Sequence, residues 1–533
     1  MAGLLTDQLR LMADAYPDEV AYCNVESGDR VTFADWDAES NRLARGLRAR
    51  GVGKGDRVGI YLEPDQILDW IITYSAVHKA GAISVPTNNR LSPGEVKTIY
   101  EHAEVTAVVT TGRYADTVGP LIRRLASLRL VIRVGDRPLP GSVGLAEAKD
   151  PDAAEIQVPL DLDDLADLMY TSGTTGRPKG VPLTHRQLVT SIRSAMAAWR
   201  WSADDVLVHA LPLYHQHGLG GVHATLIAGA TGHVRSKFTP ADLIETARAT
   251  RASVLLAVPA MYQALLVAAT GAADREPDAA TRPGTSAPPS ASVPPDAAPH
   301  GSGVLSGLRL AVCGSAPLSP ALAERLPAVL GQLPLVRYGT TETGLDVSNI
   351  YGQPAAGTLG VPLPGVLARI GSEGAELAAG EDGEIQLRGP QVFGGYWRDP
   401  AATAAAFTPD GWFRTGDIGR VDPADGQLAI RGRIKEMIIT GGLNVYPREV
   451  ELVLEDHLSV AEAAVAGVPH ERWGEQVTAW VVMRPGHDFD ERALIAHARA
   501  ALAAYKCPKQ VFKLRALPRN HLGKVLRSAL TPR

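Results

Sequence analysis

Short apolar runs alternate with longer amphipathic ones along the first part of the chain, and this alternation narrows the possible folds. Residues 58–62, 83–85 and 105–110 are apolar runs that predict strands, whereas residues 33–50 and 66–79 have the period of helices. Strands that alternate with helices form a parallel sheet covered by helices. We therefore expect an α/β fold, and the length of 533 residues indicates more than one domain.

Composition argues against several classes of protein. Hydrophobic residues make up 45% of the chain and charged residues 21%, as in ordinary globular proteins. The net charge of −5 argues against a nucleic-acid partner, and the lack of an 18-residue apolar run argues against a membrane span. Cys23, Cys313 and Cys507 lie far apart and fit neither a metal site nor a disulfide framework. Because the N-terminus also reads as an amphipathic helix rather than a signal peptide, we expect a cytoplasmic protein.

The stretch from Tyr170 to His185, YTSGTTGRPKGVPLTH, is the strongest candidate for a ligand site. It follows an apolar run at residues 165–169, and it is rich in hydroxyl groups and glycine before two cations. Such a loop suits a polyphosphate, although the Walker spacing is missing. The alternative is a flexible linker. The candidate phosphate-binding residues are Thr171, Ser172, Gly173, Thr174, Thr175, Gly176 and Lys179.

Polar residues also follow other apolar runs, at the positions where ligands of open α/β sheets usually bind. His215 follows residues 206–213, which predict a strand, and Ser315 follows a second such run. Glu342 follows a third and is a candidate ligand of a Mg²⁺ ion that bridges phosphates. Taken singly, each of these residues could instead be an ordinary structural or loop residue.

Two features divide the second half of the chain. Residues 268–303 are rich in Ala, Pro, Ser and Gly, and we interpret them as a disordered insertion inside a domain. The character of the sequence changes near Arg433, so we place a boundary between a domain of residues 1–432 and a domain of residues 433–533. The second region combines strands with an Ala-rich helix, which predicts a compact α+β domain.

Six motifs occur in a characteristic order: YTSGTTGRPKG, YGTTET, RTGD, GRIKE, GGLNVYPREVE and PRNHLGK. Together they resemble the acyl-adenylate-forming superfamily, which includes acyl-CoA synthetases. The resemblance implies a large N-terminal domain of helix-covered parallel sheets with a β-barrel-like portion, and a small mobile C-terminal α+β domain. It also implies two steps: a carboxylate attacks the α-phosphate of ATP, and a thiol, usually that of coenzyme A, then displaces AMP.

The resemblance assigns roles at the nucleotide. Tyr338 would pack against adenine, Asp417 would hold the ribose hydroxyls with Arg433 close by, and Glu342 would bind Mg²⁺. The same site would include Gly339, Thr340 and Thr341. The residues expected to take part in catalysis are Lys524, Glu342, Thr171 and His215.

The resemblance also implies a movement of the small domain. Lys435 occupies the hinge position, and rotation there would withdraw Lys524 from the α-phosphate after the first step. Gly441 and Gly442 would then line a tunnel for the thiol. A hinge is a few residues that absorb a change of backbone angle, so its substitution should affect the two steps unequally.

The acid is less well defined. LPLYHQHGLGG, LRLAVCGSAPL and ETGLDVSNIYG resemble malonyl-CoA synthetases and related ligases of short polar acids. This resemblance implies that Arg309 meets the distal carboxylate and that His215 and Ser315 belong to the pocket, although Arg309 could instead be a surface strand residue. Asp346 departs from the asparagine of that family. If the side chain of Asp346 faces the pocket, its negative charge would repel malonate. If it points away, malonate stays the first candidate.

Other functions remain open at this point. The activated group could pass to an amine or a carrier-protein thiol, or the enzyme could activate another oxyanion such as nitrite. A non-catalytic adenylate-binding scaffold would be expected to lose Lys524, Glu342 or Asp417, and all three are present. The expected ligands are ATP, Mg²⁺, coenzyme A and a small polar acid, and the sequence does not indicate an oligomeric state.

Overall fold

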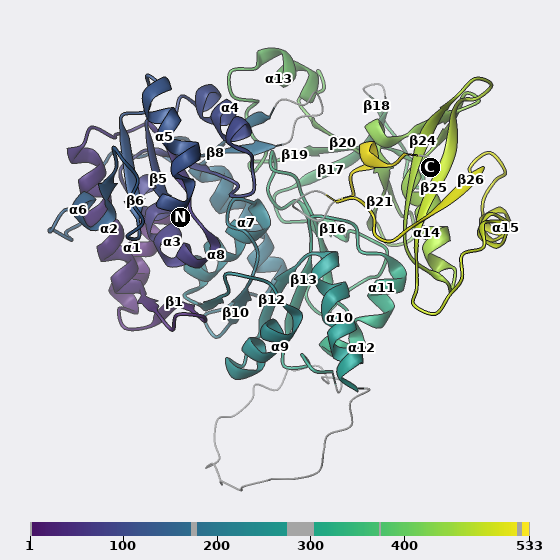
Figure 1. Ribbon diagram of the computed structural model, residues 1–533, viewed down its shortest axis with the longest axis horizontal. Helices are drawn as coiled ribbons and strands as arrows, with labels where there is room; N and C mark the ends of the chain where they lie inside the picture. Colours follow the sequence, from purple (N-terminus) through teal and green to yellow (C-terminus); the bar gives the residue numbers. More distant parts are fainter. Residues whose placement is uncertain (1–2, 172–177, 274–302, 373–374, 520–524, 532–533) are drawn as a thin grey trace, which may run out of the picture.

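Two sheets with helices on their faces form most of the large domain of the computed structural model (Figure 1). The structure describes residues 3–171, 178–273, 303–372, 375–519 and 525–531. The first sheet has the strand order β7-β6-β5-β3-β4-β8-β9 and is parallel except for the pair β8–β9. Its strands are β3 (Arg57–Tyr61), β4 (Ile83–Pro86), β5 (Ala107–Thr111), β6 (Leu130–Val134), β7 (Val143–Gly144), β8 (Leu165–Thr171) and β9 (Lys179–Thr184).

Helices bury both faces of this first sheet. Ile60 and Val109 belong to a core shared with α2 and α3, whereas Val108 and Val131 belong to a core shared with α4 and α5. Successive strand residues point to opposite faces, so a sheet buried on both sides needs nearly continuous apolar strands. The helices are α1 (Leu5–Ala15), α2 (Phe33–Ala49), α3 (Ile67–Lys79), α4 (Pro93–Ala103), α5 (Ala115–Arg124) and α6 (Leu145–Ala148), with short 3₁₀ turns η1 (Pro64–Gln66) and η2 (Gly112–Tyr114).

The second sheet has nine strands in the order β16-β15-β14-β13-β12-β10-β11-β1-β2. Its central pairs are parallel, and β2, β15 and β16 are joined to it by antiparallel pairs. The predicted strand at residues 206–213 ends early, at His209, since Pro212 has no N–H to donate to a ladder. The strands are β1 (Val20–Asn24), β2 (Arg30–Thr32), β10 (Val206–His209), β11 (Thr231–Val234), β12 (Val254–Ala257), β13 (Leu310–Cys313), β14 (Leu335–Tyr338), β15 (Val347–Ser348) and β16 (Val361–Pro362).

Helices α7 (His185–Trp199) and α8 (Gln216–Ala228) lie between the two sheets. Leu188 and Leu219 belong to the core of the first sheet, whereas Ile192 and Ala224, from the same two helices, belong to the core of the second. Helices α9 (Pro240–Ala249), α10 (Pro259–Ala273), α11 (Pro320–Arg325) and α12 (Pro327–Leu330) surround the second sheet. Residues 268–273 belong to α10, so the predicted insertion starts too early; residues 274–302 lie outside the described part of the chain.

An antiparallel sheet of five strands completes the large domain, in the place where a barrel-like portion is expected. Within the described residues its pairing runs β18-β17-β19-β20-β21 and does not close. The strands are β17 (Leu367–Ser372), β18 (Ala375–Glu376), β19 (Gly383–Arg388), β20 (Phe413–Val421) and β21 (Leu428–Arg433), with helix α13 (Pro400–Ala406) between β19 and β20.

The small domain lies at one end of the molecule, drawn in yellow-green (Figure 1). Its core contains Ile438, Val465, Val481 and Val511 and draws only on residues after the domain boundary. The elements are η3 (Ile434–Glu436), β22 (Ile438–Thr440), β23 (Leu443–Val445), α14 (Pro447–Asp456), β24 (Val460–His470), β25 (Gly474–Met483), α15 (Glu491–Ala501), β26 (Gln510–Leu514) and η4 (Arg527–Ala529). In neither domain do the described residues include a helix with the length and apolar character needed to cross a membrane.

Candidate active site

The carboxyl ends of parallel strands β10, β13 and β14 bring several of the predicted site residues to one end of the second sheet. His215 lies before α8, after β10; Ser315 follows β13; Glu342 follows β14. Because β14, β13, β12 and β10 are adjacent and parallel, the loops after them meet. This end of the sheet is therefore the candidate active site.

The predicted phosphate loop joins the edge strands of the first sheet. Thr171 ends β8, Lys179 begins β9, and the two residues are direct partners in the antiparallel pair. This pairing holds the two ends of the loop together. Ser172, Gly173, Thr174, Thr175 and Gly176 lie outside the described residues, so their role in binding phosphate stays a prediction.

Tyr396 lies between the lysine of the phosphate loop and the glutamate after β14. The Nζ atom of Lys179 lies 4.4 Å from the centroid of the Tyr396 ring. The Tyr396 hydroxyl donates a hydrogen bond of 2.9 Å to Oε1 of Glu342. The predicted phosphate ligand and the predicted Mg²⁺ ligand are thus connected through a single side chain that the motifs did not single out.

The predicted nucleotide residues Tyr338, Asp417 and Arg433 come together from three strands. The Tyr338 hydroxyl donates a hydrogen bond of 2.7 Å to Oδ2 of Asp417, and Arg433 Nε lies 2.9 Å from Oδ1 of the same carboxylate. Asp417 is 2% exposed, and burial together with this carboxylate raises the pKa of Tyr338 well above its ordinary value. A buried carboxylate beside an aromatic ring and an exposed arginine can hold a ribose diol and an adenine base.

A second cluster, made of His217, Ser315 and Arg337, lies at the ends of β13 and β14. His217 is 6% exposed, and its Nδ1 lies 3.3 Å from the Ser315 hydroxyl. A Cβ atom added to Gly314 would lie 2.5 Å from Nε of Arg337 and 3.1 Å from Cε1 of His217, so Gly314 lets the two side chains approach the strand end. Ser315 has a left-handed backbone with φ of 69°, a conformation that costs energy for residues with a Cβ.

Arg337 gives this second cluster its charge. It is 7% exposed, and its Nε has no hydrogen-bond partner within the described residues. Burial lowers the pKa of Arg337 to about 10, still high enough to keep it charged at neutral pH, and also lowers the pKa of His217. Sequence analysis gave Arg337 no role, and its signal was an arginine inside the apolar strand LVRY. His217 is the second histidine of HQHG, of which only His215 was assigned to the pocket.

Asp346 faces polar neighbours inside the protein rather than solvent. It is 0% exposed, it accepts a short hydrogen bond from the Thr343 hydroxyl, and Nε2 of Gln391 donates to it at 3.0 Å. Burial raises the pKa of Asp346 to about 7, and the charge of Arg337 opposes part of that rise. Asp346 is therefore a carboxyl that protonates near neutral pH, close to the second cluster.

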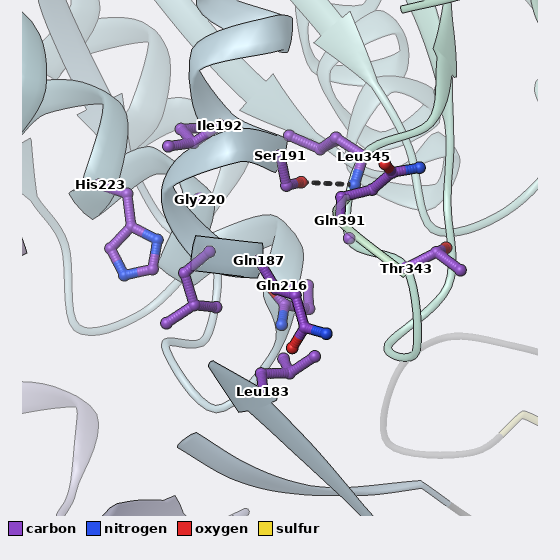
Figure 2. Close-up of a pocket in the computed structure, with 12 residues that line it drawn as sticks. Leu183, Gln187, Ser191, Ile192, Gln216, Gly220, His223, Thr343, Leu345 and Gln391 are labelled. Atoms are coloured by element: carbon purple, nitrogen blue, oxygen red, sulfur yellow. Dashed lines mark hydrogen bonds between the residues drawn. The ribbon is translucent and has the colours of Figure 1, made fainter. Parts of the chain in front are cut away.

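The Thr343–Leu345 loop closes a small cavity between α7 and α8 (Figure 2). Figure 2 shows Ser191 of α7 and His223 of α8 on the helical side, and Thr343 and Leu345 on the loop side. The backbone N–H of Leu345 donates to the Ser191 hydroxyl at 2.8 Å. The cavity volume of about 10 Å³ has room for about one water molecule, and the Leu345–Ser191 hydrogen bond holds the loop against α7.

Arg309 does not join the candidate active site. It precedes β13 and therefore lies at the amino ends of the parallel strands, opposite His215 and Ser315. Its Nε donates to Oδ1 of Asp205 at 2.7 Å, and its other nitrogens donate to the carbonyl oxygens of Trp199 and Arg200. This placement corrects the assignment of Arg309 to the acid pocket, because its guanidinium is already used by a buried carboxylate.

The hinge candidate Lys435 lies in η3, directly after β21. Burial lowers the pKa of Lys435, and the nearby charges of Lys179 and Arg433 lower it further. Gly441 and Gly442 form the turn between β22 and β23, and a Cβ atom on Gly441 would lie 3.1 Å from the ring of Trp473, which is 39% exposed. Lys524 lies outside the described residues.

Two family models match the chain: one described as AMP-binding enzyme matches residues 9–397, and one described as AMP-binding enzyme C-terminal domain matches residues 449–524. Feruloyl-CoA synthase of Amycolatopsis sp is 36% identical over 95% of this chain and 94% of its own length. The mitochondrial malonate–CoA ligase ACSF3 of Homo sapiens is 32% identical over 97% of this chain and 90% of its own. ATP-bound MatB from Rhodopseudomonas palustris is 34% identical and superposes with a TM-score of 0.85 over 98% of this chain and 97% of that chain; its apo form gives 0.77.

Proposed function

Because the chain belongs to the AMP-binding enzyme family, we propose that it activates a small polar carboxylic acid with ATP and transfers the acyl group to the thiol of coenzyme A. The observation that carries this proposal is the arrangement around Glu342. Lys179 and Glu342 both contact Tyr396. The candidate ribose ligand Asp417 contacts Tyr338 and Arg433, and the buried Arg337 lies in β14, the strand that precedes Glu342. Phosphates, nucleoside and acid can then meet at one point.

The first step requires positioning rather than a general base, since a carboxylate is already a nucleophile. Its oxygen attacks the α-phosphorus, the bond to the bridging oxygen breaks, and pyrophosphate leaves. Thr171 and Lys179 would hold the β- and γ-phosphates, and Asp417 would accept hydrogen bonds from the ribose. Lys524 would supply positive charge at the α-phosphate, where charge develops in the transition state.

The residues present suit Mg²⁺ as the metal. No group of three or more metal-ligating side chains occurs among the described residues, and the Tyr396 hydroxyl donates to only one carboxylate oxygen of Glu342, Oε1. Mg²⁺ is typically held by one or two carboxylates plus substrate phosphates. When bound, the ion would neutralise phosphate charge, and Glu342 would be its protein ligand.

The second step forms a thioester bond. The sulfur of the thiol attacks the acyl carbonyl carbon, and the bond to the phosphate oxygen of AMP breaks. Gly441 and Gly442 keep the turn between β22 and β23 free of side chains, and Trp473 beside them offers an exposed aromatic surface. These features favour a thiol with an extended pantetheine arm, such as coenzyme A, over a small amine.

The second cluster favours a short acid with an additional anionic or hydrogen-bonding group, and malonate is the first candidate. Within the described residues the buried Nε of Arg337 has no hydrogen-bond partner, and a buried guanidinium is stable only when an anion compensates it. The raised pKa of Asp346 reduces the repulsion of a dianion, since a protonated carboxyl carries no charge. Relatives with aromatic and with short acids match about equally well, so this argument rests on Arg337.

The test is AMP release from ATP over a panel of acids, namely malonate, succinate, acetate, ferulate and nitrite, with and without coenzyme A. We expect AMP release to require coenzyme A and a short dicarboxylic acid. Replacing Arg337 with Met should raise the KM for that acid by roughly 10- to 100-fold, because a hydrogen bond to a charged group is lost, and should leave ATP binding unchanged. Turnover with ferulate alone, or without coenzyme A, would contradict the proposal for acid or acceptor.

A further inference from the structure

We propose that Tyr396 is a positioning residue that keeps Lys179 and Glu342 apart and aims each at its own part of the bound nucleotide. This inference rests on the proposed function, because it concerns the ATP and Mg²⁺ that the function requires. It assigns a role to a residue that lies outside the phosphate loop and outside the Glu342 motif.

The geometry places one tyrosine against two opposite charges. The ring face of Tyr396 contacts the Lys179 ammonium at 4.4 Å, a distance typical of a cation–π interaction. The hydroxyl at the other end of the same ring donates to Glu342 at 2.9 Å. All three side chains are partly buried, so the contacts form where solvent screens charge only weakly.

The backbone around Tyr396 is itself fixed to both partners. The N–H of Phe393 donates to the carbonyl oxygen of Glu342 at 2.8 Å, and the N–H of Trp397 donates to the carbonyl oxygen of Gly180 at 2.9 Å. The segment from Phe393 to Trp397 therefore bridges the Glu342 loop and strand β9, which carries Lys179. Movement of either element displaces the tyrosine.

A glycine before the tyrosine makes this course of the chain possible. Gly395 has φ of 139°, and a Cβ atom at this position would lie 2.4 Å from Cγ2 of Thr403. The Thr403 hydroxyl in turn accepts a hydrogen bond of 2.9 Å from the N–H of Tyr396. The tyrosine is thus anchored by helix α13 as well as by its two charged neighbours.

Tyr396 stands in the way of a direct ion pair between Lys179 and Glu342. A lysine and a glutamate at a shared site tend to form a direct ion pair. That ion pair must break before either side chain can bind a ligand. Within the described part of the chain Lys179 and Glu342 form no direct ion pair, and the phenol of Tyr396 contacts both without neutralising either. Burial and the charge of Glu342 raise the pKa of Tyr396, so the hydroxyl remains a donor at working pH.

Two substitutions separate the contributions of the hydroxyl and the ring. Tyr396→Phe keeps the ring under Lys179 and removes the hydrogen bond to Glu342, whereas Tyr396→Leu removes both. Calorimetry without acid measures ATP binding with and without Mg²⁺, so the result does not depend on turnover. Tyr351→Phe is the matched control, because Tyr351 lies beside Arg309 at the opposite edge of the sheet.

We expect Tyr396→Phe to weaken binding of Mg·ATP about 10-fold and to leave binding of metal-free ATP within about twofold of the native protein. Tyr396→Leu should also weaken metal-free ATP, by about 5-fold. Equal binding by the Phe variant and the native protein in both conditions would overturn the inference, and so would equal losses in the two variants under both conditions. If the native protein binds no ATP, the proposed function itself fails, which is a different result.

Discussion

Asp205 and Asp346 are two almost fully buried carboxylates of the large domain. They differ in whether a cation at hydrogen-bond distance compensates the negative charge. Asp205 pairs with Arg309 and also accepts hydrogen bonds from the Ser253 hydroxyl and the Ser202 N–H. Asp346 has only neutral donors at hydrogen-bond distance, so its charge is poorly compensated. Asp205 is therefore paired with a cation of the scaffold, whereas burial raises the pKa of Asp346 to about 7.

Substitution of Asp346 by Asn should change how stability depends on pH. The pKa of Asp346 is about 7 in the folded protein against an ordinary value of 3.8, so between these values the folded state holds a proton that the unfolded state has lost. The stability that Asp346 contributes is therefore present at low pH and is lost as pH rises to about 7, by up to roughly 1.4 kcal/mol per pH unit. The measurement is the difference in unfolding free energy between native protein and Asp346→Asn from pH 5 to pH 8.

Asp410 offers the matched control for this experiment. It is an exposed carboxylate whose pKa is lowered to about 2 by Arg369, so it is ionised in both folded and unfolded protein throughout pH 5 to 8. The corresponding difference for Asp410→Asn should be flat across that range. A flat profile for Asp346→Asn as well would mean that the buried carboxyl does not titrate as described.

At the scale of single residues, sequence reasoning located side chains that follow strands and missed those that lie inside them. His215, Ser315 and Glu342 come directly after apolar runs, and the edge of a parallel sheet gathers such positions. Arg337 lies within a strand. The alternation of residues along a strand predicts which face of the sheet a side chain occupies, but not which group it contacts there. Tyr396 contacts Lys179 and Glu342, which lie far from it in sequence, and no local pattern predicts such contacts.

At the scale of elements, the amino ends of the central strands carry structural charge and the carboxyl ends carry the site. Asp205 before β10 and Arg309 before β13 join two strands to the end of α7 through the carbonyl oxygens of Trp199 and Arg200. This pair explains why an arginine that resembles a substrate ligand in sequence lies away from the substrate. The motif LRLAVCGSAPL contains strand β13 and the Ser315 that follows it, but its arginine, Arg309, lies at the amino end of that strand, away from the site.

Removal of Arg309 from its pair with Asp205 should lower the free energy of unfolding and leave the specificity for the acid unchanged. Arg309→Met leaves Asp205, which is 2% exposed, without its cation, and we expect a loss of about 3–5 kcal/mol in unfolding free energy. The KM for the acid should stay within about twofold of the native value. Adding Asp205→Asn should recover part of the stability, because the uncompensated charge is then removed.

The control for that substitution is Arg200→Met, an exposed arginine over the same Tyr351 ring. It should change stability by less than about 1 kcal/mol. A large rise in the KM for the acid in Arg309→Met, with stability unchanged, would restore Arg309 to the acid pocket.

One element that the sequence analysis did not predict is β9. Its sequence, KGVPLT, contains Pro182, and proline inside a run argues against a central strand. The structure places β9 at the edge of the first sheet, where a missing N–H leaves no partner unsatisfied within the sheet. The alternation of strands and helices before residue 110 was confirmed because each of those strands has the apolar run that a doubly covered sheet needs.

At the scale of the whole molecule, two bodies meet at a short charged joint. The large domain ends with β21, the small domain has a core of its own, and η3 with Lys435 lies between them. Superposition of the whole chain gives a TM-score of 0.85 with ATP-bound MatB and 0.77 with apo MatB. We propose that the structure represents the arrangement suited to the first step.

Substitution of Lys435 by Pro tests whether the joint is a hinge. Proline holds φ near −65°, which is compatible with a 3₁₀ turn, so it should retain the present arrangement and oppose rotation. We expect ATP–pyrophosphate exchange to stay within a few-fold of the native rate and thioester formation to fall by more than about 10-fold. The two half-reactions are measured separately, with Lys435→Ala as the control that removes the charge but leaves the backbone free. Equal losses in both half-reactions would mean that residue 435 is not the hinge.

The left-handed backbone of Ser315 has a practical consequence for changing the acid that the enzyme accepts. Glycine, asparagine and aspartate adopt positive φ most readily, whereas β-branched residues do so only with strain. A mutant library aimed at a wider acid range should therefore vary His217 and Arg337 broadly and restrict position 315 to Ser, Gly, Asn and Asp. Codons outside that set would enrich the library in misfolded members rather than in new specificities.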